Sequence, residues 1–167
     1  KLGMPNADNI HHLSYGMVEL TTGKMKSREG TVVDADDLIQ EVVDTARAVT
    51  TELGKLDDFN DEERNALFEM IGLAALKYFL LKVDPKKRML FDPAASIDLQ
   101  GHTGPFIQYT YARIRSLSRK AGTVGAWSVA ERITTPLLPE ERAVLKHLCH
   151  FPVVLNEAAK AMDPSAL

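Results

Sequence analysis

The spacing of apolar residues changes once along the chain, and the change separates a short extended segment from a long helical one. Over residues 13–20 apolar and polar positions alternate, which predicts a strand with Leu13, Tyr15 and Met17 on one face. From residue 34 onward apolar side chains recur at steps of three and four, which is the period of an amphipathic helix. We therefore expect a mainly α-helical chain with one or two short strands.

Two helices are predicted after the strand. The first can be capped by Asp34 or Asp36 and ends near Gly54, because aspartate favours helix starts and glycine favours helix ends. The second begins with a capping box in which Asn60 and Glu63 satisfy each other's backbone N–H groups. Its apolar positions are dense enough to predict burial on more than one side.

A charged segment bounded by prolines, residues 84–93, follows the second helix. Pro85 stops the helix, since proline lacks the N–H that a helix interior requires. We interpret the segment as a linker and place the boundary between two units there. The units are then residues 1–90 and residues 91–167.

A third helix is expected to begin at Pro105, which suits a first helical turn, and to end at Gly122. Its apolar positions include Ile107 and Ile114. Tyr111 falls in step with both, so we expect its ring in the core.

The remaining chain predicts two short helices, residues 140–151 and 153–162, because Pro152 interrupts an otherwise helical pattern. A length of 167 residues with 45% hydrophobic content is enough to bury a core. The chain therefore suits one domain or two small ones, and it does not have the composition of a disordered tail.

Charge is distributed unevenly behind a net value of −3. Acidic side chains dominate residues 34–63 and basic ones residues 77–120, so the second region could meet phosphate and the first would repel it. Cys149 is the only cysteine, which excludes an internal disulfide and fits a reducing compartment. With no long apolar run and no charged leader after Lys1, we expect a cytoplasmic piece of a longer protein, without a membrane span.

The candidate chemistry is concentrated in residues 23–33. Three cations and the hydroxyl of Ser27 lie there between two glycines, with the hydroxyl of Thr31 just beyond the second, directly after the predicted strand. Lysine and arginine supply the positive charge that a triphosphate needs, and glycines allow the backbone to move toward a ligand. A basic, glycine-bounded loop is by itself often only a solvated turn.

The amino-acid sequences of this loop and of three further blocks resemble those of a known family. Residues 23–33 resemble the Lys-Met-Ser-Lys-Ser signature loop of class I aminoacyl-tRNA synthetases. Residues 11–18, 75–81 and 98–113 are similar, in that order, to arginyl-tRNA synthetases, and the last block is the most specific. The resemblance runs over nearly the whole chain, and the blocks around Tyr15 and Gln108 favour the arginyl family over other class I synthetases.

The resemblance implies a fold and an activity. Residues 1–90 would form the C-terminal end of a Rossmann-type catalytic domain, and residues 91–167 the first helices of an α-helical anticodon-binding bundle. The activity implied is arginine–tRNA ligase, which activates L-arginine with ATP to arginyl-adenylate and transfers it to tRNA(Arg). ATP is then a substrate, accompanied by Mg²⁺, and no tightly bound cofactor or structural metal is expected.

The resemblance also assigns roles within the loop, residues 23–31. Lys24 and Lys26 would be catalytic, because cations that close on the phosphoryl oxygens as charge develops lower the barrier. The ATP-binding set would be Gly23, Lys24, Met25, Lys26, Ser27 and Gly30, with a hydroxyl hydrogen bond from Ser27 and hinges at the glycines.

The loop departs from the family signature at its fourth position, where Ser27 replaces the usual lysine and Lys26 comes one place early. Either the loop shifts its register so that Lys26 reaches the same oxygens, or a cation elsewhere in the complete protein acts instead. The family's other ATP-binding motif, His-x-Gly-His, does not occur in the sequence, so we expect this fragment alone to be inactive.

Aromatic and cationic side chains gather in the third predicted helix. Such groups stack on bases and pair with phosphates. Arg113 lies one helical turn after Tyr109 and could pack on its ring. The candidate tRNA contacts are Tyr109, Arg113, Arg115, Arg119 and Lys120.

The histidines and the cysteine do not predict a further functional site. His11 and His12 point to opposite faces of a strand, and the cluster of His147, Cys149 and His150 would need further ligands, so no metal site is predicted. We expect neither a membrane nor DNA as a partner. The alternatives left open are a non-catalytic tRNA-binding helical module, a different class I synthetase, and a helical protein-interaction piece that uses the acidic face of residues 34–63.

Overall fold

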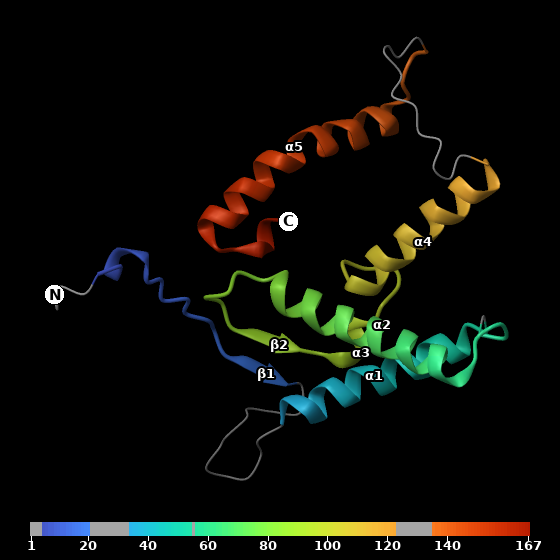
Figure 1. The fold of residues 1–167 in the computed structure, drawn as a ribbon, viewed down its shortest axis with the longest axis horizontal. Helices are drawn as coiled ribbons and strands as arrows, with labels where there is room; N and C mark the ends of the chain where they lie inside the picture. Colours follow the sequence, from blue (N-terminus) through green and yellow to red (C-terminus); the bar gives the residue numbers. More distant parts are fainter. Residues whose placement is uncertain (1–4, 21–33, 55, 123–134) are drawn as a thin grey trace.

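The computed structural model describes residues 5–20, 34–54, 56–122 and 135–167. Figure 1 shows a mainly helical chain with a small two-stranded sheet, as the sequence predicts. The elements, in order, are the 3₁₀ turn η1 (Ala7–Asn9), β1 (Val18–Leu20), α1 (Ala35–Glu52), α2 (Asp61–Leu81), β2 (Met89–Phe91), α3 (Pro93–Ser96), α4 (Gly104–Lys120), α5 (Pro139–Ala161) and the 3₁₀ turn η2 (Pro164–Ala166). Among them, no helix is long and apolar enough to cross a bilayer.

The two strands are parallel, with Val18 opposite Met89 and Leu20 opposite Phe91. A parallel pair needs a crossover, which α1 and α2 provide. The linker predicted for residues 84–93 is therefore wrong, because β2 lies within it and the Phe91 side chain is completely buried. Three apolar residues between charges are too few to produce a readable strand period.

The first predicted strand is shorter than the alternation over residues 13–20 indicates. Only its last three residues pair with β2, while Leu13, Tyr15 and Met17 are exposed in the extended segment before it. Alternation alone therefore overestimates the strand, since a strand extends only as far as a neighbouring backbone pairs with it.

Both helix starts predicted in the first half are confirmed. The Asp34 carboxylate caps α1 by accepting a hydrogen bond from the Asp36 N–H at 3.1 Å. Asn60 and Glu63 form the reciprocal capping box of α2, each accepting the other's backbone N–H at 2.9 Å. These bonds satisfy N–H groups that a helix start leaves without internal partners.

The core lies where α1 and α2 cover the sheet. It is made of Leu20, Val42, Ala46, Ala75, Leu76, Phe91 and Ile97. Gly72 allows α2 to approach α1 closely, because a Cβ there would lie 3.0 Å from the backbone of Val43. The Phe79 ring meets the Phe91 ring edge-on at 5.1 Å, which ties α2 to β2.

The start of α4 is seated on α2. Thr103 caps α4 through the Phe106 N–H, and Pro105 lies in its first turn as predicted. A Cβ at Gly104 would overlap the carbonyl of Ala74, so only glycine permits this approach. At the other end α4 stops near Gly122, whose φ of +67° belongs to the left-handed region.

Two further bonds join α2 to the region around α4. The side-chain amide of Gln108 donates to the Met70 carbonyl at 3.3 Å. The Lys82 ammonium donates to the His102 carbonyl at 3.2 Å and lies 4.4 Å from the centre of the Phe79 ring. Lys82 therefore connects the end of α2 to the segment that leads into α4, a role that sequence analysis did not identify.

Two predictions for the second half are wrong. The helices expected at residues 140–151 and 153–162 are one continuous helix, α5, with Pro152 inside it. Proline removes the hydrogen bond to the Leu148 carbonyl, and α5 tolerates the loss there because its surroundings are exposed to water. Tyr111 is not in the core, since 64% of its surface is exposed and its side chain lines an open groove between α4 and helices α1 and α2.

Candidate nucleotide and RNA site

The six residues proposed to bind ATP, Gly23, Lys24, Met25, Lys26, Ser27 and Gly30, lie outside the described residues. The structure does describe what flanks them: β1 ends at Leu20, and α1 begins at Ala35. The signature loop thus connects the carboxyl end of a parallel strand to a helix start. In open α/β sheets, ligands bind outside the carboxyl ends of the strands, which is the edge where this loop begins.

The start of α1 is electrostatically unsuited to a phosphate. Asp34, Asp36 and Asp37 all lie in its cap and first turn, and all are exposed. Three carboxylates oppose the partial positive charge that a helix start otherwise offers an anion. The start of α1 would therefore add no attraction for a triphosphate bound at this end of the loop.

The expected packing between Arg113 and Tyr109 on α4 is confirmed. The Arg113 guanidinium lies 5.7 Å from the centre of the Tyr109 ring, and its Nη1 donates a hydrogen bond to the Tyr109 hydroxyl at 3.0 Å. Tyr109 is 45% exposed. The pair holds a cation over an aromatic ring at the surface of the helix, an arrangement suited to a phosphate next to a base.

The remaining candidate RNA contacts are exposed but lie on two different sides of α4. Lys120 follows Arg113 by seven residues, so both point within about 20° of each other around the helix axis. Arg115 and Arg119 form a second pair, and they lie about 160° and about 120° around the helix axis from Arg113. Between the two pairs lies the exposed apolar side of α4, which includes Phe106, Ile114 and Leu117. One RNA strand lying along α4 would reach one pair at a time.

An apolar groove of about 610 Å³ separates α4 from α1 and α2. Its walls include Leu53, Met70, Ile107 and Tyr111. The groove has almost no polar surface, so it does not suit a phosphate. One polar atom beside it, the buried Oε1 of Gln108, accepts no hydrogen bond within the described chain.

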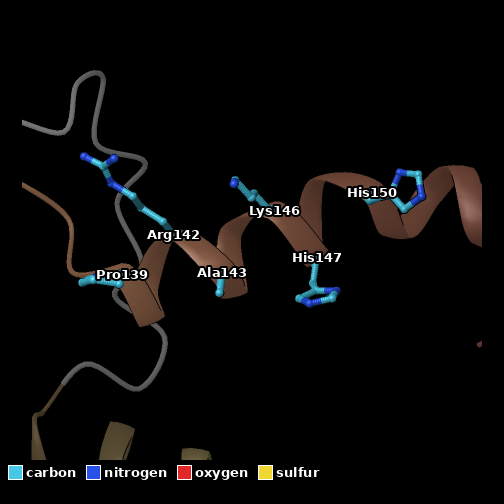
Figure 2. A pocket seen from close by; sticks show the side chains of 6 residues that line it. All are labelled: Pro139, Arg142, Ala143, Lys146, His147 and His150. Atoms are coloured by element: carbon cyan, nitrogen blue, oxygen red, sulfur yellow. The ribbon is translucent and has the colours of Figure 1, made fainter.

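The histidines do not form a metal centre in the described part of the chain, where no three His, Cys, Asp or Glu side chains come close enough to share an ion. His11 and His12 lie exposed in the extended segment before β1. His147 and His150 lie on α5 beside Arg142 and Lys146, as Figure 2 shows, so their neighbours are cations.

The acidic face predicted for residues 34–63 is exposed. Within it, Asp44 pairs with Arg47 at 3.4 Å and accepts a hydrogen bond from Gln40 at 3.1 Å. These are local contacts along α1, of the kind that solvated helices make. A partner for this face remains a hypothesis.

Two family models match the chain, one on each side of α3. Residues 1–92 match a model described as tRNA synthetases class I (R), catalytic domain. Residues 107–167 match a model described as DALR anticodon binding domain. The first match covers β1 to β2, and the second covers most of α4 and all of α5.

Relatives and a solved structure agree with these matches. The chain is 52% identical over 167 residues to an arginine–tRNA ligase of Flavobacterium psychrophilum and 54% identical over 169 residues to one of Amoebophilus asiaticus. All of this chain is covered in both, and it spans 27% and 28% of the relatives' lengths. Arginyl-tRNA synthetase of Thermus thermophilus superposes with a TM-score of 0.78 at 31% identity, over 96% of this chain and 25% of that one. The chain therefore belongs to the arginyl-tRNA synthetase family, and it spans the end of the catalytic domain and part of the anticodon-binding domain.

Proposed function

We propose that the protein to which this chain belongs is an arginine–tRNA ligase, which activates L-arginine with ATP to arginyl-adenylate and transfers the arginyl group to tRNA(Arg). Identity of 52% over the whole chain to a relative of that name carries this proposal. The two units, residues 1–90 and 91–167, would divide the work between nucleotide chemistry and RNA binding. A cytoplasmic location belongs to the same proposal.

The loop would act during adenylation. The arginine carboxylate attacks the α-phosphorus of ATP in line, a new C–O–P linkage forms, and pyrophosphate leaves with the bonding electrons. Negative charge builds on the phosphoryl oxygens, and Lys24 and Lys26 would close on them as it does. Ser27 would donate a hydrogen bond to an oxygen, while Gly23 and Gly30 would allow the closure.

Mg²⁺ would accompany ATP, because phosphate oxygens provide most of its ligands in such sites. No three acidic, histidine or cysteine side chains in the described ranges are placed to hold it. No reaction step is therefore assigned to the ion. In the loop, Met25 is proposed only to contact ATP.

The catalytic proposal is tested in the full-length protein by Lys24→Ala and Lys26→Ala. We expect kcat for arginine activation to fall by about 10²-fold or more with little change in the KM for ATP, because the contacts act mainly in the transition state. Arg28→Ala is the matched control, since it removes a cation of the same loop that has no assigned contact. Equal losses in all three variants would show that only the total charge matters, and unchanged kcat in both lysine variants would contradict the proposal.

RNA binding is assigned to α4, through Tyr109, Arg113, Arg115, Arg119 and Lys120. Because the cations form two pairs on different sides, the double variants Arg113→Gln/Lys120→Gln and Arg115→Gln/Arg119→Gln separate them. Removal of the pair that contacts the RNA backbone should lower the slope of log K against log salt by about 1.4 to 1.8, since each lost phosphate contact contributes about 0.7 to 0.9. Binding to tRNA(Arg) that neither double variant changes would contradict the assignment.

One alternative function can be tested against this proposal. A non-catalytic tRNA-binding module would bind tRNA with the usual salt dependence, contact no ATP, and keep its affinity after replacement of Lys24 and Lys26.

A further inference from the structure

The first half of α5 carries a row of three basic side chains, two of them the cations Arg142 and Lys146, that no assigned function uses. Arg142, Lys146 and His150 follow one another at steps of four residues. Successive members are then about 6 Å apart along the axis and about 40° apart around it, so they form a line on one side of the helix. Figure 2 shows Arg142 and Lys146 on one side of the α5 ribbon and Ala143 and His147 on the other.

These three residues, which we name the α5 cation row after the charges of Arg142 and Lys146, are exposed, and no ion pair joins them to an acid in the described ranges. In the described ranges neither Arg142 nor Lys146 takes part in an ion pair. The nearest acids point elsewhere: Glu141 uses its carboxylate to accept the Leu138 N–H at 2.8 Å, and Glu140 lies about 160° around the helix from Arg142. The positive charge of the row is therefore not neutralised by an acid in the part of the chain that the structure describes.

A hollow runs beside the row. It has a volume of about 650 Å³ and is lined by Pro139, Arg142, Ala143, Lys146, His147 and His150 (Figure 2). All six residues come from α5, so the hollow is an open surface that an elongated partner could follow. A deep pocket for a small molecule would need walls from other elements.

The apolar side of α5 determines which way the row faces. Leu148, Phe151 and Leu155 are exposed and lie on the side of the helix opposite Arg142 and Lys146. This is the side that would be buried when α5 packs against any other part of the protein. The row would then point outward, toward solvent or a bound polyanion.

We propose that the α5 cation row binds the phosphate backbone of tRNA and makes a second contact separate from α4. The inference rests on the proposed RNA-binding function, and it is supported by the anticodon-binding match, which includes all of α5. A regular line of cations suits a regularly charged backbone, and Arg and Lys bind phosphate strongly. Such contacts position an RNA without reading its sequence.

The test compares tRNA(Arg) binding by the 167-residue chain and by the double variant Arg142→Gln/Lys146→Gln. Glutamine keeps a polar side chain and a similar helix propensity while removing the charge. We expect the slope of log K against log salt to fall by about 1.4 to 1.8 for two lost phosphate contacts. Lys160→Gln is the matched control, because it lies on the same side of α5 but has Glu157 one turn before it; it should leave the slope unchanged.

A second measurement uses the unaltered chain and so does not depend on whether a variant folds. Acetylation of lysines is followed with and without tRNA, and Lys146 should be protected several-fold while Lys160 is not. An unchanged slope in the double variant, or equal acetylation of Lys146 with and without tRNA, would overturn the row's role. Equal protection by poly-glutamate would also overturn it, by indicating a surface for any acidic polymer.

The same data separate this inference from the proposed function. If the double variants on α4 lower the slope and the α5 variant does not, RNA binding stands and the row has no part in it. If the unaltered chain shows no salt-dependent affinity for tRNA, both assignments fail.

Discussion

The helices α1, before β2, and α4 and α5, after it, have similar amphipathic sequences and different surroundings. In α1, the apolar positions Val42 and Ala46 are completely buried against α2 and the sheet. In α4 and α5, Tyr111 and Leu148 occupy equivalent apolar positions and are 64% and 63% exposed. Helical period thus identifies the apolar side of a helix, but burial depends on whether another element covers it.

The difference in burial between α1 and the helices α4 and α5 suits the two proposed roles, nucleotide chemistry in the first unit and RNA binding in the second. Backbone contacts at Gly72 and Gly104 fix α1, α2 and the start of α4 relative to one another. The signature loop is anchored on this packed region by β1 and α1. Beyond it, α4 and α5 present cations and uncovered apolar sides, as parts of a binding unit that other segments of a longer protein would complete.

The largest effect is expected from emptying the core of the packed region. Phe91→Ala removes a completely buried ring that contacts Phe79, so unfolding free energy should fall by about 3 to 5 kcal/mol. Urea denaturation of the chain, followed by circular dichroism, measures the loss. A loss below about 1 kcal/mol would mean that β2 does not form part of the core.

A smaller loss is expected where α4 meets α2. Gly104→Ala places a methyl group against the Ala74 carbonyl, and the strain should cost about 1 to 3 kcal/mol. Gly101→Ala is the control, since its added Cβ would have no neighbour closer than 3.7 Å. Equal denaturation midpoints for the two variants would show that α4 is not held against α2 in this way.

The capping box of α2 should contribute about 1 kcal/mol. Asn60→Ala leaves the Glu63 N–H without its partner, whereas Asn65→Ala changes an exposed interior position of the same helix and improves its helix propensity. The first substitution should lower the urea midpoint and the second should not. A reversed order would contradict the cap.

The smallest effect on stability is expected on the exposed apolar side of α4. Ile114→Ala on α4 should change stability by less than about 0.5 kcal/mol, since 54% of Ile114 is exposed in this chain. The same substitution in the full-length protein should cost more if another segment covers that side. An equally small change in both would indicate that the apolar side of α4 stays exposed.

The parts of the fold that local chemistry determines could be read from the sequence. Caps at Asp34 and Asn60 act within three residues, so the starts of α1 and α2 are encoded locally and were predicted. The start of α4 was predicted from Pro105, whereas its cap Thr103, which also acts within three residues, was not identified. The glycine at the end of α4 is local as well. The family was predicted from the amino-acid sequences of the motifs, and not from the period of hydrophobic residues.

The features that could not be predicted from the sequence depend on contacts between residues far apart in the chain. The strand β2 forms because Met89 and Phe91 meet β1 across two helices, and Lys82 reaches the His102 carbonyl twenty positions away. The continuity of α5 through Pro152 also escaped a rule that treats proline as a helix end. In the candidate site, the pairing of Arg113 with Tyr109 was predictable from helical spacing, whereas the anchoring of α4 on α2 was not.

Hydrogen exchange of the chain with and without tRNA(Arg) tests the central claim most directly, namely that the packed region orients the site while the open region contacts RNA. The account predicts that tRNA slows amide exchange in α4 and in the first half of α5 and leaves α1 unchanged. Slower exchange confined to α1 and α2, with α4 and α5 unaffected, would contradict it.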